Sequence, residues 1–447
     1  MRRWSNRLLV LVLAVSGGPL VLAEGLLDVH QYESEGDVLV RSWGPSAEGH
    51  FQLTFSRRAG GISSWYDLDR DPSHTLNLAG RGDLPPVALL MHTLAPVARQ
   101  ARSPEPGRGA LRRSPKLLYS APAEKITMVE SNAVRVQVCL EGVYGEAEAA
   151  EEFGGRSADE GPVRPGGERD PANRFTTTYT VYPTGQLYVC HRIVRRATVL
   201  RVGGCQWVLA TAPSTQFQVA GSPGAPEPRT LSDFVLHTSS GPQYYADVLL
   251  VPTRPGLPIS RWGERFLVGH DEMGAVRSAF EMLPADATIG VETHPWCCLL
   301  QIEPDWMDRA ELAVIAAEAY QRPPLLRVQP GEGEVCRGDV GDDNLDGFSE
   351  RQGCYTLRAA RTGCRFSLDL SNSLLVTPVF HFSDWHGPSP RTLRVEGQEW
   401  HRGREFEAVL LDQSTLLVQF YRNLKGRRVE VEMSTGYDPA HPSAEGL

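Results

Sequence analysis

The sequence lacks an excess of positive charge, and after residue 23 it lacks a long apolar run. Its 447 residues hold 45 Lys and Arg against 54 Asp and Glu, a formal net charge of -9. Because basic side chains dominate nucleic-acid binding, this balance argues against nucleic acid as the main partner. No later stretch approaches the roughly 20 apolar residues that a membrane-spanning helix needs. We therefore expect no transmembrane anchor in the mature chain.

Several short catalytic and metal motifs are also missing. The sequence contains no serine nucleophile elbow, no phosphate-binding loop, no dinucleotide fingerprint and no cysteine or histidine spacing typical of zinc. These absences argue against a serine hydrolase with a nucleophile elbow, against nucleotide chemistry and against a zinc site. Apolar residues make up 41% of the chain, which is enough to build hydrophobic cores and excludes a wholly disordered protein.

The N-terminus has the pattern of a secretory signal peptide. Arg2, Arg3 and Arg7 precede an apolar stretch that a Gly-Gly-Pro break interrupts, and short aliphatic residues lead to Ala23. We predict that residues 1–23 are a signal peptide cleaved after Ala23, and that the mature protein is secreted or periplasmic. An uncleaved membrane anchor is the alternative, although the interrupted apolar run is short for a span.

Export would place the eight cysteines in an oxidising compartment, where disulfides persist. Eight cysteines allow many pairings, so the connectivity stays open. Local spacing favours Cys190 with Cys205 and Cys354 with Cys364, because each pair flanks a short strand-turn-strand pattern. Buried free thiols are an equally good interpretation.

Short runs with a period of two, rich in Val, Leu, Thr, Tyr and Phe, alternate with Gly and Pro turns along most of the chain. This alternation is typical of antiparallel strands with one buried face. One helix is expected before Pro323, since Leu312, Ile315 and Ala319 fall on one face at helical spacing. Three long loops are expected at 99–116, 145–173 and 221–229, with disorder favoured for the second.

Three segments resemble parts of one known architecture. Phe51–Phe55 with the glycine turn and strand up to Leu68 resembles the opening hairpin of the galactose-mutarotase-like β-supersandwich. The hairpin Thr176–Val189 is similar to the middle strands of that module in β-galactosidases and polysaccharide lyases. Pro378–Val431 resembles a small immunoglobulin-like accessory sandwich of secreted carbohydrate-active proteins. The resemblance implies a mainly β fold, an antiparallel β-supersandwich followed by a small C-terminal β-sandwich, with one short connecting α-helix.

The same resemblance implies a domain plan and a ligand class. We expect a supersandwich domain over residues 24–325 and a C-terminal immunoglobulin-like sandwich with a calcium loop over 326–447. The expected function is that of an exported protein that binds or processes an extracellular polysaccharide or oligosaccharide. A polysaccharide lyase or glycoside hydrolase in its own right is one alternative, and a structural or adhesion protein of the cell envelope is the other. No catalytic residue set of those enzymes can be matched, so catalysis stays open.

The segment Asp342–Glu350, with the sequence DDNLDGFSE, has the spacing of a calcium-binding loop. Oxygen side chains at positions one, three and five, Gly at six and a carboxylate at nine reproduce the first part of an EF-hand loop. Position twelve is Gly353, where an EF-hand has a Glu. A solvated acidic turn is the alternative, since these residues also favour turns. The ligands expected for a structural Ca²⁺ are Asp342, Asn344, Asp346, Phe348 and Glu350.

Aromatic and charged residues gather in the segment from 261 to 296. Sugar sites commonly pair an aromatic ring, which stacks on a pyranose, with charged groups that bind its hydroxyls. The predicted carbohydrate-binding residues are Arg261, Trp262, Arg265 and Trp296. Carboxylates and histidines there would serve glycoside hydrolysis or proton abstraction, and the predicted catalytic residues are Glu264, His270, Glu292 and His294. The alternative is that the tryptophans are core residues and the charges lie on exposed strands.

Overall fold

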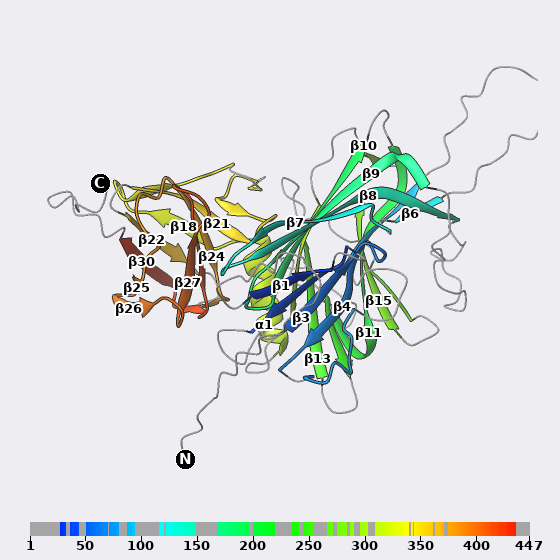
Figure 1. Cartoon of the computed structure of the whole chain (residues 1–447), viewed down its shortest axis with the longest axis horizontal. Coiled ribbons are helices and arrows are strands. Elements are labelled where there is room, and N and C mark those ends of the chain that lie inside the picture. Colours follow the sequence, from blue (N-terminus) through cyan, green and yellow to red (C-terminus); the bar gives the residue numbers. More distant parts are fainter. Residues whose placement is uncertain are drawn as a thin grey trace, which may run out of the picture.

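The structure of the chain is a computed structural model in which strands predominate (Figure 1). It describes residues 27–32, 36–43, 51–69, 71–79, 87–93, 116–119, 122–148, 169–195, 200–219, 235–240, 245–253, 266–270, 275–283, 287–289, 296–302, 309–338, 341–342, 344–360, 363–370 and 374–434. The prediction of a mainly β fold with antiparallel sheets and a connecting helix is confirmed.

The N-terminal part of the described chain contains a small antiparallel sheet. Its strands, in spatial order, are β1 (Leu27–Gln31), β2 (Val38–Ser42), β3 (Phe51–Ser56) and β4 (Gly61–Asp67). The predicted hairpin is the β3–β4 pair, in which Leu53 lies opposite Trp65. Alternate residues of β1, β2 and β3 are buried, as the period of two requires for a sheet with one covered face.

A second, larger sheet contains thirteen described strands. They are β5 (Val87–Thr93), β6 (Lys116–Tyr119), β7 (Lys125–Ser131), β8 (Val136–Glu148), β9 (Arg169–Val181), β10 (Gln186–Arg195), β11 (Leu200–Val219), β12 (Val235–Ser240), β13 (Tyr245–Thr253), β14 (Phe266–His270), β15 (Ala275–Leu283), β16 (Ala287–Ile289) and β17 (Trp296–Ile302). The main path is β12-β13-β17-β10-β9-β8-β6-β5-β11-β15-β14, and β7 pairs with β8. For β5, β6 and β11 to β16 the backbone alone is described.

The small sheet packs on one face of the large sheet. Val136, Val138 and Leu140 of β8 are fully buried in one cluster with Phe55 of β3 and Trp65 of β4. Figure 1 shows the small sheet lying across the strands of the large one. The two sheets thus form an N-terminal sandwich, and burying each such side chain contributes roughly 1.5–3 kcal/mol to its core.

The C-terminal third forms a separate β-sandwich. One sheet contains β18 (Leu325–Val328), β22 (Gly363–Asp369), β25 (Thr392–Val395), β26 (Gln398–His401) and β30 (Arg428–Ser434). The facing sheet contains β19 (Gly333–Val335), β20 (Phe348–Ser349), β21 (Cys354–Ala359), β24 (Val379–Ser383), β27 (Phe406–Leu410) and β28 (Leu416–Phe420). A short pair is made by β23 (Leu374–Leu375) and β29 (Leu424–Lys425). The β21–β24 pairing is parallel.

A second apolar cluster joins the two sandwiches. The helix α1 (Arg309–Gln321) lies between them, and its Ala317 and Tyr320 pack in the same buried cluster as Tyr188 of β10 and Leu299 of β17. That cluster continues into the C-terminal sandwich through residues such as Phe380. The predicted helix is therefore present, and it ends shortly before the Pro323-Pro324 pair, as expected. Within the described residues no helix is long and apolar enough to cross a membrane.

Two predictions made from local patterns differ from the structure. The 145–173 segment is predicted to be a loop, but β8 runs to Glu148 and β9 begins at Arg169, while residues 149–168 lie outside the described part of the chain. The pair Cys354–Cys364 is not formed: both are free thiols, as the alternative interpretation has it, and their strands β21 and β22 belong to different sheets. Spacing along the chain suggested a hairpin there, whereas β21 pairs with β19, β20 and β24.

Candidate functional site

The predicted sugar-binding and catalytic residues lie mostly outside the described part of the chain. This holds for Arg261, Trp262, Glu264, Arg265, Glu292 and His294. His270 ends β14 and Trp296 begins β17, and for both the backbone alone is described. Seven strands stand between β17 and β14 along the main path of the sheet, so strand pairing does not bring His270 next to Trp296. Their roles therefore stay predictions.

The central strands of the large sheet have a polar face that points away from β1 to β4. Side chains alternate across a strand, so every second residue of β8, β9 and β10 lies opposite the apolar core. We call the polar side chains of β7 to β10 on this side the outer face. They are Lys125, Thr127, Gln137, Cys139, Glu141, Thr176, Thr178, Thr180, Cys190 and Arg192. All but Thr180 are half-buried or exposed.

Strand register arranges the outer face in rows. One row contains charges around a threonine, in the order Lys125, Glu141, Thr176 and Arg192. The next row contains hydroxyls and thiols, in the order Thr127, Cys139, Thr178 and Cys190. Neighbouring strands are about 4.8 Å apart and same-face residues about 7 Å apart along a strand. The outer face thus presents hydrogen-bonding groups at spacings comparable to a sugar ring.

Sequence analysis missed this surface. The run Thr176-Thr177-Thr178 indicated a strand, but period-two patterns do not say which face a second sheet covers. The available signal was the alternation in β8, where Gln137, Cys139 and Glu141 interleave with aliphatic residues. That pattern marks a strand with one polar face.

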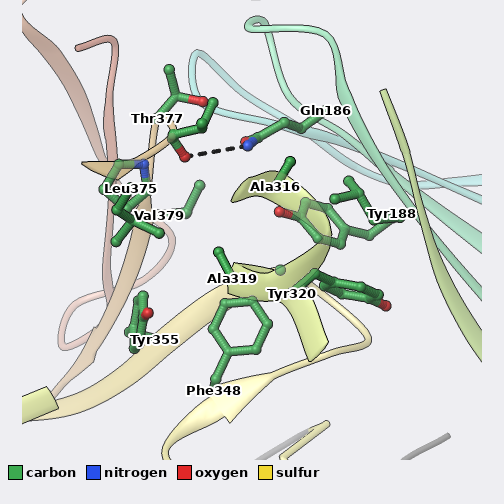
Figure 2. A pocket seen from close by; sticks show the side chains of 14 residues that line it. Gln186, Tyr188, Ala316, Ala319, Tyr320, Phe348, Tyr355, Leu375, Thr377 and Val379 are labelled. Atoms are coloured by element: carbon green, nitrogen blue, oxygen red, sulfur yellow. Dashed lines mark hydrogen bonds between the residues drawn. The ribbon is translucent and has the colours of Figure 1, made fainter. Parts of the chain in front are cut away.

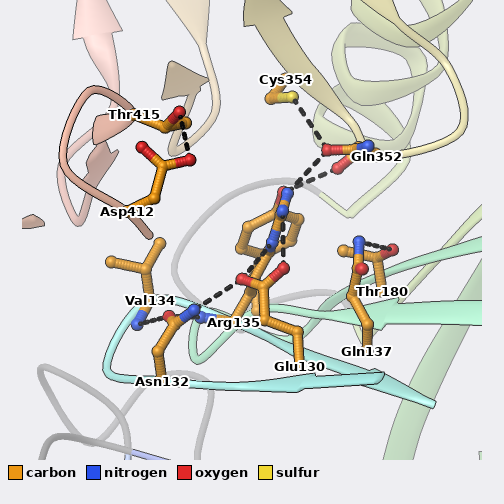
Figure 3. Close-up of polar contacts among 11 residues, drawn as sticks. Glu130, Asn132, Val134, Arg135, Gln137, Thr180, Gln352, Cys354, Asp412 and Thr415 are labelled. Carbon is orange, nitrogen blue, oxygen red and sulfur yellow. Dashed lines mark hydrogen bonds and ion pairs between the residues drawn. The ribbon is translucent and has the colours of Figure 1, made fainter. Parts of the chain in front are cut away.

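One end of the outer face is closed by a buried arginine at the junction of the two sandwiches (Figure 3). Arg135 is 3% exposed. Its Nε and Nη2 donate to the two carboxylate oxygens of Glu130 at 2.8 Å, and its Nη1 donates to Oε1 of Gln352 at 2.8 Å. Burial alone would lower the pKa of Arg135, but Tyr182 and Glu130 together raise it above its ordinary value. The guanidinium stays charged and ties the N-terminal sandwich to the C-terminal sandwich.

The residues after the acidic loop form the other half of this junction. The Tyr182 hydroxyl donates to the carbonyl oxygen of Gln352 at 2.7 Å. Gly353 has φ +67° and lies so close to Tyr188 that an added Cβ would come within 2.0 Å of the ring. Position twelve of the loop is therefore a glycine because the chain passes against an aromatic ring of the other sandwich. A Glu there would separate the two sandwiches.

A small cavity lies between the sandwiches beside α1 (Figure 2). Its volume is about 30 Å³, and Tyr188, Tyr320 and Phe348 contribute rings to its wall. In the described part of the chain, Oε1 of Gln186 and the Tyr355 hydroxyl are buried and make no hydrogen bond. A water molecule needs roughly 10–15 Å³ of such volume, so the cavity suits one or two waters and is too small for a sugar ring.

His191 is a structural histidine. It is 1% exposed, its Nδ1 hydrogen-bonds with Oγ1 of Thr177 at 2.8 Å, and its Nε2 hydrogen-bonds with the hydroxyl of Tyr144. Phe175 stacks on the imidazole with ring centroids 5.8 Å apart. Burial lowers the pKa of His191 to about 3, so the ring is neutral at ordinary pH. The side chain lies on the core face, away from the outer face.

Hydrogen bonds among its own polar groups hold the loop for which calcium binding is predicted, Asp342–Glu350. Oδ2 of Asp342 accepts from the backbone N–H of Gly347 at 2.9 Å. The amide nitrogen of Asn344 bridges Asp346 at 3.0 Å and Glu350 at 2.6 Å. Asp342 and Glu350 are 3% and 2% exposed. Buried carboxylates need such hydrogen bonds, because burial penalises an unpaired charge.

The carboxylates of this loop influence one another. Burial raises the pKa of Asp346, and the neighbouring Asp342 carboxylate raises it further. Phe348 at position seven is buried, and its N–H donates to Asp346 at 2.8 Å. Among the described residues, which omit position 343, no group of three or more His, Cys, Asp or Glu side chains is arranged to hold a metal. Calcium binding therefore stays a proposal.

No family model and no curated protein matches the chain. Solved structures with a similar backbone include the galactose 1-epimerase of Lactobacillus acidophilus, at 6% identity and a TM-score of 0.32, covering 62% of this chain and 98% of the epimerase. The heparan sulfate lyase of Pedobacter heparinus has 8% identity and a TM-score of 0.30, covering 78% of this chain and 40% of the lyase. The 4-alpha-glucanotransferase of Thermococcus litoralis has 12% identity and a TM-score of 0.27, covering 62% of this chain and 39% of the transferase.

Proposed function

We propose that this chain is an exported carbohydrate-binding protein that holds an extracellular polysaccharide or oligosaccharide on its outer face. The observation that carries the proposal is the pair of polar rows on β7 to β10, where Lys125, Glu141 and Arg192 flank the hydroxyls of Thr176 and Thr178. Hydroxyls, amides and charges hydrogen-bond to sugar hydroxyls without needing a deep pocket. The face is rigid because its other side is the apolar core.

The charges favour an acidic sugar over a neutral one. Lys125 and Arg192 are exposed, and Glu141 between them is half-buried. Further along the strands, Nη2 of Arg174 donates to Glu124 at 2.8 Å, with both side chains 36% exposed. Arginine binds carboxylates and sulfates in a bidentate manner, so uronate or sulfate groups would add affinity.

Calcium has a structural role in this proposal. The loop Asp342–Glu350 leads directly into Gln352 and Gly353, which lie at the junction of the sandwiches. A bound Ca²⁺ would supply positive charge to the buried carboxylates and hold the loop in place. The immunoglobulin-like character of the C-terminal sandwich, the cleavage after Ala23 and a secreted or periplasmic location belong to the same proposal.

The experiment is a screen of the purified chain, with calcium present, against neutral and acidic polysaccharides, recording retention and product formation together. We expect retention of at least one acidic glycan. Arg192→Ala and Glu141→Ala should each weaken it about tenfold, since a charge-assisted hydrogen bond contributes roughly 1.5–3 kcal/mol. Arg394→Ala and Glu399→Ala, exposed partners on β25 and β26, are the matched control and should leave retention unchanged. If the outer-face variants and the control variants lose glycan retention equally, the outer face is not the binding site.

A lyase or glycosidase is the second candidate, because the predicted catalytic residues Glu264, His270, Glu292 and His294 include the required acids and bases. New reducing ends or unsaturated products, lost in Glu292→Ala and His294→Ala, would establish it. If no glycan is retained and no product forms, the structural or adhesion alternative takes first place.

A further inference from the structure

Two cysteines lie directly opposite each other on neighbouring strands of the large sheet. Cys190 of β10 pairs with Cys297 of β17 in antiparallel register. The two thiols are reduced in this structure and lie within hydrogen-bonding reach of each other. Cys190 is half-buried at the end of the row formed by Thr178 and Cys139, whereas Cys297 is fully buried.

This register satisfies the geometry of a disulfide. Residues directly opposite in an antiparallel pair have Cα atoms about 4.5 or 5.5 Å apart, depending on their hydrogen-bonding pattern. Bridged cysteines have Cα atoms about 4.4–6.8 Å apart, so both kinds of pair fall within the range. Opposite residues also project to the same face, which places both sulfur atoms on one side of the sheet.

The other cysteines near Cys190 are less suitable partners. Cys139 lies on the same face but two strands away, with Thr178 between them, so the spacing is about 9–10 Å. Cys298 follows Cys297 and therefore projects to the opposite face. Cys205, the partner predicted from spacing, lies on β11, which pairs with β5, β12, β15 and β16 but not with β10.

We propose that Cys190 and Cys297 form a cross-strand disulfide when the chain meets an external disulfide of the glutathione type. The Cys190 thiolate attacks one sulfur of the external disulfide, which forms a mixed disulfide and releases one thiol. The Cys297 thiol then loses its proton to the departing thiolate as its sulfur attacks Cys190, which releases the second thiol. Two electrons and two protons pass from the cysteine pair to the external disulfide, which leaves as two thiols.

The surroundings set the order of these steps. Burial raises the pKa of Cys297, and the adjacent Cys190 raises it further, so Cys297 still holds its proton when Cys190 reacts. The half-buried Cys190 is therefore the thiol that an external disulfide reaches first. The product would join β10 to β17 on the side of the outer face and enclose residues 191–296 in a covalent loop.

The test uses the purified full chain equilibrated in mixtures of reduced and oxidised glutathione, with remaining thiols alkylated before proteolysis and mass spectrometry. We expect a peptide that links Cys190 to Cys297 in oxidising mixtures and its loss after reduction. Oxidation should also raise the melting temperature by about 5 °C, because a loop of this length constrains the unfolded chain. Cys190→Ser and Cys297→Ser should both abolish the link, and Cys139→Ser should keep it.

The wild-type peptide map decides the outcome even if a serine variant fails to fold. A link from Cys190 to Cys205 or Cys139 would overturn the proposal. Complete alkylation of Cys190 and Cys297 in the most oxidising mixture would overturn it too. The disulfide and the carbohydrate site are independent, since the mass spectrum reports the link whether or not a glycan binds.

Discussion

The same three strands, β8 to β10, present two unlike faces. On one side Val138, Tyr179 and Val189 are 0–1% exposed and pack against the small sheet. On the other side their immediate neighbours along the chain, such as Thr178 and Cys190, are half-buried and polar. The core uses alternate residues of each strand and leaves the others available for binding. The fold and the proposed function thus depend on separate sets of side chains in one segment.

The outer face is itself divided. Towards Gln186 and Tyr188 it becomes buried, because α1 and the C-terminal sandwich cover it. Towards Thr176 and Arg192 it is open. Arg135 lies where the two parts meet, and its buried charge is neutralised by Glu130. The covered part therefore joins the sandwiches, and only the open part is available to a ligand.

The largest contrast is expected between adjacent residues of β9. Tyr179 is 1% exposed and its ring lies 4.9 Å from that of Phe55, so Tyr179→Ala should lower the free energy of unfolding by about 4 kcal/mol. Thr178→Ala, on the outer face, should change it by less than about 0.5 kcal/mol. Urea unfolding of both variants measures the difference. Similar losses would mean that the two faces are equally packed.

Two arginines test the division of the outer face. Arg135→Ala should cost about 3 kcal/mol or more, because it leaves the Glu130 carboxylate without its buried partner at the junction. Arg192→Ala, on the open part, should leave stability within about 0.5 kcal/mol of wild type. Thermal unfolding of the two variants provides the measurement. A large loss in Arg192→Ala would show that the open part carries structure as well.

The buried histidine on the core face should make stability depend on pH. Its folded pKa of about 3 lies below the unfolded value, so the unfolded chain binds the extra proton and stability falls as pH falls below about 6.5. The contribution of His191 is about 1.4 kcal/mol for each pH unit between 6 and 4. Unfolding free energies of His191→Gln should show a slope smaller by that amount. If the slope of unfolding free energy against pH is unchanged in His191→Gln, another group is responsible for the pH dependence.

Calcium should have a smaller effect, confined to the acidic loop. With calcium at 100 times its dissociation constant, chelation should lower stability by about 2.7 kcal/mol or less. Asp342→Asn should remove most of this dependence, while Asp412→Asn, in another acidic turn of the same sandwich, should keep it. Calorimetry with calcium or a chelator makes the comparison. A wild-type melting temperature that is the same with calcium and with the chelator would favour the solvated-turn interpretation.

Local features of the fold could be predicted from the sequence, and long-range pairing could not. The β3–β4 and β9–β10 hairpins follow from alternation and turn residues, and the helix ends before Pro323 for the same kind of local reason. The order of thirteen strands depends on partners far apart in the chain. For that reason Cys190 was matched by spacing with Cys205, whereas the sheet places it beside Cys297.

The binding surface depends on long-range packing in the same way. Thr176 and Thr178 could be assigned to a strand, but their exposure depends on the small sheet covering the opposite side. The acidic loop was recognisable because its spacing is local. The requirement for glycine at position 353 could not be recognised, because it comes from the ring of Tyr188 in the other sandwich.

The most direct test of the central claim is the affinity of the Glu141→Ala and Arg192→Ala double variant for an acidic oligosaccharide retained by the wild type. Titration calorimetry of this variant and of the Arg394→Ala and Glu399→Ala control gives two dissociation constants. We expect the outer-face variant to bind more than about tenfold weaker and the control to bind like wild type, since only the former loses charge-assisted hydrogen bonds to the ligand. Equal affinities for the two variants would contradict a carbohydrate site on the outer face.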